Sequence, residues 1–120
     1  MNYTLIRTTM YNIEDESLDI YLGTDTSADP VYSEPIGIYA TNSQYTKYQC
    51  FSYGLHTVMM RDSFGDGWST GSQLQISLNG EVLATILWTC ARTTTYSCTS
   101  TFTIVEPLVW QYTSTPQTGS

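Results

Sequence analysis

A glycine-rich segment at residues 62–72 constrains the fold more than any other stretch, because alternating runs of apolar residues flank it. In residues 55–60 before it and 74–78 after it, about one side chain in two is apolar, which is typical of β-strands. Three glycines that can adopt positive φ and two aspartates that can accept loop N–H groups stand in the segment: Gly65, Gly67, Gly71, Asp62 and Asp66. Trp68 is large and apolar, so we expect it to fold back and plug the end of a sandwich.

Strand-like runs of this kind recur along the chain, and no window has the sustained spacing of an amphipathic helix. Further strands are predicted at residues 2–13, 18–22, 36–39, 45–51, 82–87 and 99–105. Asn79-Gly80 predicts a tight hairpin between two of the runs, since both residue types accept positive φ. Short strands separated by turns indicate an all-β fold, an antiparallel β-sandwich of the jelly-roll or immunoglobulin-like kind with about eight strands.

The N-terminal run is set apart from the rest by the acidic residues 14–16, which we expect to form a hydrophilic joint outside any core. We therefore divide the chain into an N-terminal strand and joint at 1–17, a sandwich domain at 18–105 and an extended tail at 106–120. The strand carries apolar side chains on both faces. Tyr3 and Leu5 share one face with Arg7 and Thr9; the other face carries Thr4, Ile6, Thr8 and Met10.

Charge and composition exclude some partners. The chain has 4 Lys and Arg against 11 Asp and Glu, a net charge of −7, which leaves too few cations to follow a phosphate backbone. Nucleic acid and anionic membrane surfaces are therefore unsuitable partners, and no apolar run is long enough for a membrane-spanning helix. A composition rich in Thr, Ser and Tyr and poor in Lys predicts an extracellular protein, secreted or at the cell surface.

Three cysteines and one glycosylation sequon are relevant to the predicted extracellular location. Cys90 and Cys98 flank a stretch suited to a bridged loop, which would leave Cys50 unpaired, although pairings of Cys50 with either of them stay open. Asn2 begins an Asn-Tyr-Thr sequon, so it is a candidate for N-glycosylation. The threonine run at 93–95 would suit O-linked glycans.

The central segment also resembles a known module. Residues 50–57, the run Asp-Ser-Phe-Gly-Asp-Gly-Trp at 62–68 and Gly71 are similar to the "DSYGDGW" β-sandwich module of secreted and surface proteins in bacteria and protists. The resemblance covers roughly residues 18–105 and departs from the pattern at Leu55, where the module often has a cysteine. It implies a sandwich fold and a place in structural or adhesive extracellular chains.

The sequence favours a binding or structural role over catalysis. His56 has no evident Ser or Cys partner for nucleophilic catalysis. Asp62 and Asp66 share one loop instead of flanking a cleft, as a glycosidase would require, so we expect no enzymatic activity. The two aspartates and exposed loop carbonyls could hold calcium, with turn formation as the alternative role.

Self-assembly is the function we favour from the sequence. An alternating terminal strand before an acidic joint can complete a neighbour's sheet, and such head-to-tail addition leads to a fibre. Residues 3–11 are then the inter-subunit contact, through Tyr3, Leu5, Ile6, Thr8 and Met10. The alternative is a lectin-like module that binds glycans on surface aromatic side chains, with Trp68, Trp88 and Trp110 as candidates.

Overall fold

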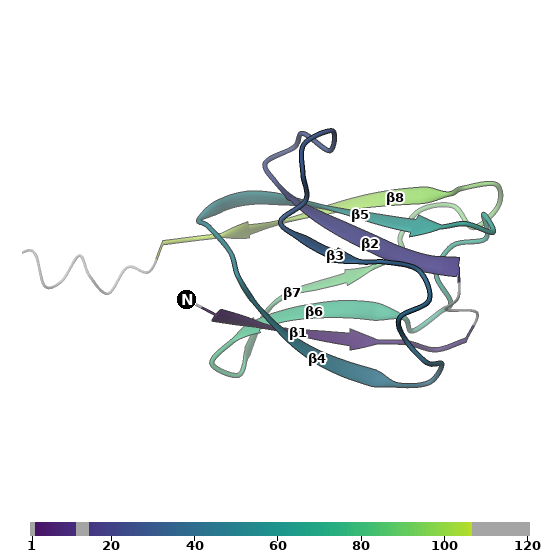
Figure 1. Cartoon of the computed structure of the whole chain (residues 1–120), viewed down its shortest axis with the longest axis horizontal. Coiled ribbons are helices and arrows are strands. Elements are labelled where there is room, and N and C mark those ends of the chain that lie inside the picture. The colour runs from purple at the N-terminus through teal and green to yellow at the C-terminus, as the bar shows by residue number, and fades with distance from the viewer. Residues whose placement is uncertain (1, 12–14, 107–120) are drawn as a thin grey trace, which may run out of the picture.

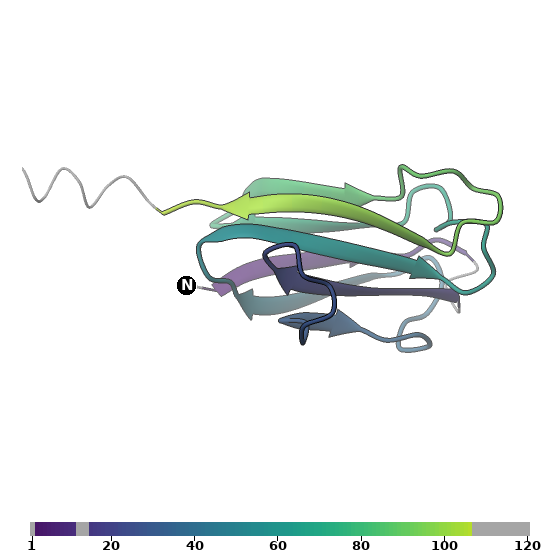
Figure 2. The same ribbon diagram turned by 90° about the horizontal axis from the view of Figure 1, so that it is seen from above.

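The computed structural model describes residues 2–11 and 15–106, and these form two antiparallel sheets of four strands each. Sheet A has the order β4 (Gln44–Cys50), β1 (Asn2–Thr8), β6 (Gln73–Leu78) and β7 (Glu81–Leu87). Sheet B has the order β3 (Tyr32–Glu34), β2 (Glu16–Leu22), β5 (Gly54–Asp62) and β8 (Ser97–Ile104). The sheets lie face to face as two layers (Figures 1 and 2), so the predicted all-β sandwich is confirmed.

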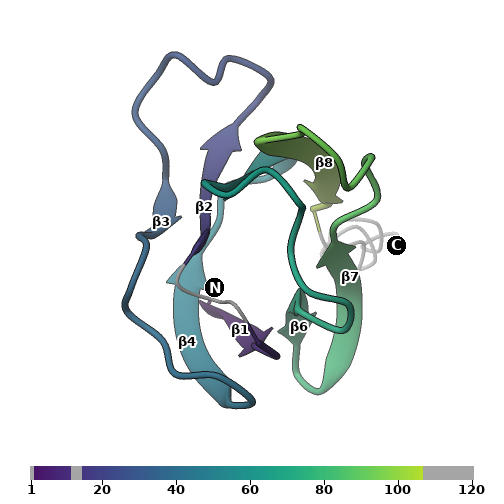
Figure 3. The ribbon, with the colours of Figure 1, turned by 90° about the vertical axis from the view of Figure 1, so that its right-hand side faces the viewer.

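The first strand lies inside its sheet. β1 pairs with β4 through all seven of its residues and with β6 through five of them. The strand that the sequence assigned to a separate segment, 1–17, is therefore part of sheet A in this chain. In the end-on view of Figure 3, β4, β1, β6 and β7 follow one another along one wall of the sandwich.

The core lies between the two sheets and follows the predicted alternation. Along β1 the inward residues are buried and the outward ones are partly exposed, so Tyr3 and Leu5 face the core while Ile6 faces outward. β5, β2 and β6 supply much of the remaining core, with Val58, Met60, Leu18, Ile20, Leu74 and Ile76 buried. Trp68 is fully buried, which agrees with the plug expected from the sequence.

Two predictions about local structure were wrong. Residues 36–39 do not form a strand; the partner of β2 is β3 at Tyr32–Glu34, and Tyr39 in the following loop stacks on Tyr45. Glu16 does not lie in an exposed joint, because it is the buried first residue of β2. A carboxylate is tolerated there because a guanidinium group meets it inside the protein.

Two short-range features fix the remaining connections. Asn79 and Gly80 both have positive φ, at 53° and 85°, as the tight β6–β7 turn requires. Cys90 and Cys98 form a disulfide between the loop after β7 and the second residue of β8. Cys50, at the end of β4, is exposed and free. The predicted tail at 106–120 lies outside the described residues, apart from Glu106.

Candidate functional site

Trp68 lies at one end of the sandwich, and all three arginines of the chain contact it there. The guanidinium carbon of Arg7 stands 4.1 Å from the centre of its indole ring, a cation–π contact. Its indole Nε1 donates to the carbonyl of Arg61 at 3.0 Å, and Arg92 donates from Nη1 to its backbone carbonyl. The tryptophan is therefore fixed on its ring face, at its ring nitrogen and through its main chain.

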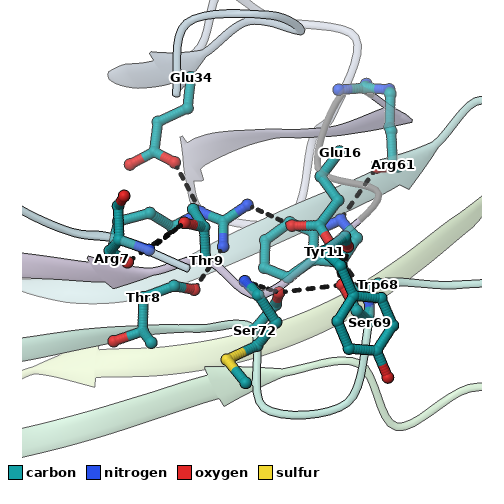
Figure 4. A network of polar contacts seen from close by, with 12 residues as sticks. Arg7, Thr8, Thr9, Tyr11, Glu16, Glu34, Arg61, Trp68, Ser69 and Ser72 are labelled. Carbon is teal, nitrogen blue, oxygen red and sulfur yellow. Dashed lines mark hydrogen bonds and ion pairs between the residues drawn. The ribbon is translucent and has the colours of Figure 1, made fainter. Parts of the chain in front are cut away.

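Arg7 is the only cation of β1, and it is buried with 2% exposure. Its Nη2 donates to Glu16 Oε1 at 2.8 Å, and its Nε donates to Glu34 Oε1 at 3.0 Å, as Figure 4 shows. Its Nη1 donates to the carbonyl of Thr8 at 3.0 Å. One side chain from sheet A thus bridges two carboxylates from the neighbouring strands β2 and β3 of sheet B.

The two carboxylates have further partners. Glu16 Oε2 accepts from the Ser69 N–H at 3.0 Å and from the Ser69 hydroxyl at 3.2 Å. Glu34 Oε2 accepts from the Tyr32 hydroxyl at 2.6 Å. Burial, together with the Glu34 carboxylate, raises the pKa of Tyr32 far above its ordinary value, so the phenol stays a donor. The buried charges are thus paired and hydrogen-bonded, as low-dielectric surroundings require.

The glycine-rich segment positions Trp68 through Asp62. This aspartate is buried, and its Oδ2 accepts from the N–H groups of Asp66 and Gly67, at 2.7 Å each. Gly67 has a φ of 80°, and a Cβ there would stand 2.7 Å from Nε1 of Trp88. Only a glycine fits between this backbone and the buried indole ring of Trp88.

The loop closed by the disulfide packs against the same segment. The N–H of Asp62 donates to the carbonyl of Tyr96 at 2.9 Å, and that of Thr95 donates to the carbonyl of Gly65 at 3.1 Å. Gly65 has a φ of 90°, and a Cβ there would stand 2.7 Å from the Tyr96 ring. Gly71 has a φ of 96° and lies against the side chain of Met10, beyond the end of β1.

The two aspartates that are candidates for calcium binding or for turn formation lie in this loop and differ in exposure: Asp62 is buried and Asp66 is exposed. Burial raises the pKa of Asp62, and the nearby Asp66 carboxyl raises it further. The hydrogen bonds from the N–H groups of Asp66 and Gly67 lower the pKa of Asp62. Among the described residues, no group of three or more His, Cys, Asp and Glu side chains is placed to hold a metal ion.

A pocket of about 160 Å³ opens beside Trp68. It is lined by Tyr11, Asp66, Gly67, Trp68, Ser69, Thr70 and Arg92. Tyr11 is exposed and offers an aromatic face, whereas the indole rings of Trp68 and Trp88 are buried and cannot serve as open platforms for a sugar ring. Trp110 lies outside the described residues.

His56 belongs to the core at the far end of the sandwich. Its ring stacks on Phe102 at a centroid distance of 5.0 Å and meets the ring of Phe51 edge-on at 5.2 Å. Burial lowers the pKa of His56, so the imidazole is neutral near pH 7. Its Nδ1 lies 3.1 Å from the carbonyl of Gly54.

The glycosylation candidate begins β1. Asn2 is exposed and pairs in register with Cys50, whose Sγ donates to Asn2 Oδ1 at 2.9 Å. A glycan on Asn2 would extend from the outer face of sheet A, since Tyr3 is the first inward residue of the strand.

The chain matches no protein-family model, no curated protein and no solved structure. The resemblance to the secreted module therefore rests on residues 50–57, the run at 62–68 and Gly71. In the part of the chain that the structure describes, no helix is long and apolar enough to cross a membrane.

The Arg7 cluster was not predicted from the sequence, although one signal was present. Arg7 shares a face of the first strand with Tyr3 and Leu5, and an arginine on a core face needs a buried counter-charge. The counter-charges are 9 and 27 residues away, and no local pattern identifies them. Glu16 was assigned to the acidic joint at 14–16.

Proposed function

We propose that this chain is a non-enzymatic structural subunit of an extracellular fibre or surface assembly, and that subunits join by exchanging β1. The observation that carries the proposal is the position of β1, a strand at the start of the chain that nevertheless lies in the middle of a sheet. Without it, β4 and β6 would each present an unpaired edge to the same groove, and β1 of a second copy has the matching length and register.

Exchange of an identical strand costs little, because each contact of the closed subunit is made again in the assembly. Tyr3 and Leu5 would occupy the same core positions in the neighbour, and Ile6 and Thr8 the same outward ones. The connection from residue 9 to 15, when extended, spans roughly 23 Å at about 3.3 Å per residue. That length allows β1 to leave its own sandwich while β2 remains in place.

The ends of the connection constrain the geometry of exchange. β1 ends and β2 begins at the end of the sandwich that carries Trp68, so a donor and its acceptor meet through these ends (Figure 1). Reciprocal exchange gives a closed dimer, whereas one-way exchange leaves one free strand and one open groove and continues as a fibre.

The extracellular location is supported by two features. A disulfide between Cys90 and Cys98 persists in an oxidising compartment. Asn2 is exposed on the outer face of β1, where a glycan would leave the core face of the strand free for either subunit. Calcium at Asp62 and Asp66 remains a proposal that a chelator tests.

A disulfide at the first pair of the β1–β4 ladder tests the exchange directly. Asn2 faces Cys50 in register, so Asn2→Cys in the full chain allows oxidation to join β1 to whichever β4 it pairs with. In assembled material we expect a ladder of covalent oligomers on a non-reducing gel, which reductant collapses to monomer. Electron microscopy of the same sample is expected to show fibres.

The matched control is Asn2→Cys combined with Cys50→Ser, which keeps the fold and removes the bridge. If Asn2→Cys gives only an intrachain bridge, and light scattering finds only monomers from micromolar to millimolar chain, β1 serves its own subunit alone and the proposal is wrong. A covalent dimer without higher species would indicate reciprocal exchange instead of a fibre.

A second candidate function, carbohydrate binding, is favoured by the pocket beside Trp68. One exposed tyrosine, one carboxylate and one arginine converge there with two hydroxyl side chains. Aromatic rings contact the apolar face of a sugar, and charged side chains bind its hydroxyl groups. The volume, about 160 Å³, suits a single small polar ligand better than a long oligosaccharide.

A glycan array with the monomeric chain tests this candidate. Sugar-selective binding that Tyr11→Ala abolishes, and that Tyr48→Ala on the exposed face of β4 leaves unchanged, would support it. Loss of binding in both variants, or no binding by the unaltered chain, would contradict it.

A further inference from the structure

We propose that Arg7 is the residue by which the acceptor groove recognises an incoming β1, so that the groove selects the first strand of a second copy over other extended segments. This inference rests on the proposed strand exchange and names its partner and the basis of its selectivity. The groove contributes Glu16, Glu34 and the ring of Trp68, and the strand contributes the guanidinium group.

The core face of β1 presents three successive inward side chains of different chemistry. Tyr3 is 3% exposed and lies against the ring of Phe51 at a centroid distance of 5.8 Å; Leu5 is fully buried. Arg7 is the third. Among the eight described strands, only β1 places an aromatic residue, an aliphatic residue and a cation at consecutive inward positions. Other strands could satisfy the backbone ladder but would not match these three positions.

The cation matters most because its absence leaves two carboxylates without a counter-charge. Glu16 and Glu34 are 5% and 3% exposed, and the structure records no other ion pair to either of them among the described residues. A strand with an apolar residue in place of Arg7 would bury both charges unpaired, which is strongly unfavourable. A strand with a carboxylate there would add a third negative charge.

The geometry also favours arginine over lysine. The guanidinium donates to Glu34 from Nε and to Glu16 from Nη2, while its face lies on Trp68. A planar group with donors in several directions makes these contacts together, whereas an ammonium group has neither the planar face nor the fixed spread. We therefore expect the groove to bind the native strand most tightly, the Arg7→Lys strand less tightly and the Arg7→Met strand least tightly.

The test uses a fluorescent peptide of residues 2–11 and a full-length acceptor whose own strand is weakened by Leu5→Ala. That change leaves Glu16, Glu34 and Trp68 intact. Uptake is followed by fluorescence anisotropy at equilibrium, with the native peptide and with Arg7→Lys and Arg7→Met peptides. We expect the native peptide to bind roughly 100-fold or more tightly than the Arg7→Met peptide, the scale of an unpaired buried charge.

The matched acceptor adds Glu16→Gln and Glu34→Gln, which remove both charges and keep the side-chain shapes. On it, the preference for arginine is expected to fall to within a few-fold. Should the Leu5→Ala chain not fold, the unaltered chain is refolded from urea with excess peptide and the incorporated label is compared. This gives the same ranking without a weakened strand.

The outcomes separate this inference from the proposed function. Equal uptake of the native and Arg7→Met peptides would overturn the role of Arg7 and leave strand exchange standing. No uptake of any peptide, by either route, would overturn both. A preference for arginine that persists on the Gln acceptor would show that Trp68 or the backbone selects the strand, and that the carboxylates do not.

Discussion

Among the described residues two arginines, Arg7 and Arg61, form ion pairs, and the pairing has different consequences at the two places. Arg7 lies between the sheets, 2% exposed, and bridges Glu16 and Glu34. The side chain of Arg61 lies on the outer face of sheet B, 41% exposed, and pairs with Asp19 on the neighbouring strand. Water can replace either partner of the exposed pair but neither partner of the buried cluster, so only the buried cluster constrains which strand fits.

The largest effect is expected when the buried cluster loses its cation. Arg7→Met should lower the free energy of unfolding by about 3–5 kcal/mol, because two buried carboxylates lose their counter-charge. Urea denaturation measures it. The triple variant Arg7→Met, Glu16→Gln, Glu34→Gln should recover most of the loss. A triple variant as unstable as the single one would show that Arg7 acts mainly through packing on Trp68.

The next effect concerns the glycine-rich loop at 62–72, because its Trp68 ring lies against the guanidinium group of Arg7. Gly67→Val places a β-branched residue at positive φ, with its Cβ against Trp88. The strain and overpacking should together lower the free energy of unfolding by about 3 kcal/mol, whereas Asp66→Asn should not lower it. Thermal unfolding compares them. Gly80→Val, at positive φ in the open β6–β7 turn, is the control without overpacking; equal losses would show that strain alone accounts for the cost.

A smaller effect with a defined pH dependence is expected at Asp62. Its folded pKa lies above the unfolded value because of burial and then the Asp66 carboxyl, so deprotonation favours the unfolded state. The contribution of Asp62 to stability therefore falls as pH rises from about 4 through its raised pKa. Asp66→Asn removes one cause of the raised pKa, so in urea denaturation it should be more stable than the native chain near pH 7 and equal to it near pH 3.

Calcium would reverse the sign of that difference. If the two aspartates hold the ion, calcium should raise the melting temperature of the native chain, a chelator should lower it, and Asp66→Asn should abolish both responses. A melting curve that neither addition changes would leave both aspartates as residues that shape the loop.

The smallest effect is expected at the exposed pair. Arg61→Gln should change the free energy of unfolding by about 0.5 kcal/mol, because water and salt screen the attraction to Asp19. The difference should shrink in about 1 M salt. A loss as large as that of Arg7→Met would remove the distinction between the buried and the exposed pair.

Much of the fold followed from local pattern. Alternation predicted which side chains of β1 share a face, and Tyr3 and Leu5 do lie together on the core face. Asn79-Gly80 predicted the β6–β7 turn, and the size of Trp68 predicted its burial. The region around β3 was misread, because three paired residues between two loops carry too little pattern to distinguish them from residues 36–39.

The sequence by itself determined most of the strands, which of their side chains share a face, and the β6–β7 turn, because these depend on residues close together in the chain. Only the tertiary structure decided that β1 lies between β4 and β6, and that Glu16 and Glu34 meet Arg7 inside the protein. Strand order depends on contacts between distant segments of the chain. A charged residue is predicted to be exposed unless its counter-charge can be identified, and the sequence does not identify it. The carboxylate expected in a solvated joint became a core residue because folding brought a guanidinium group to it.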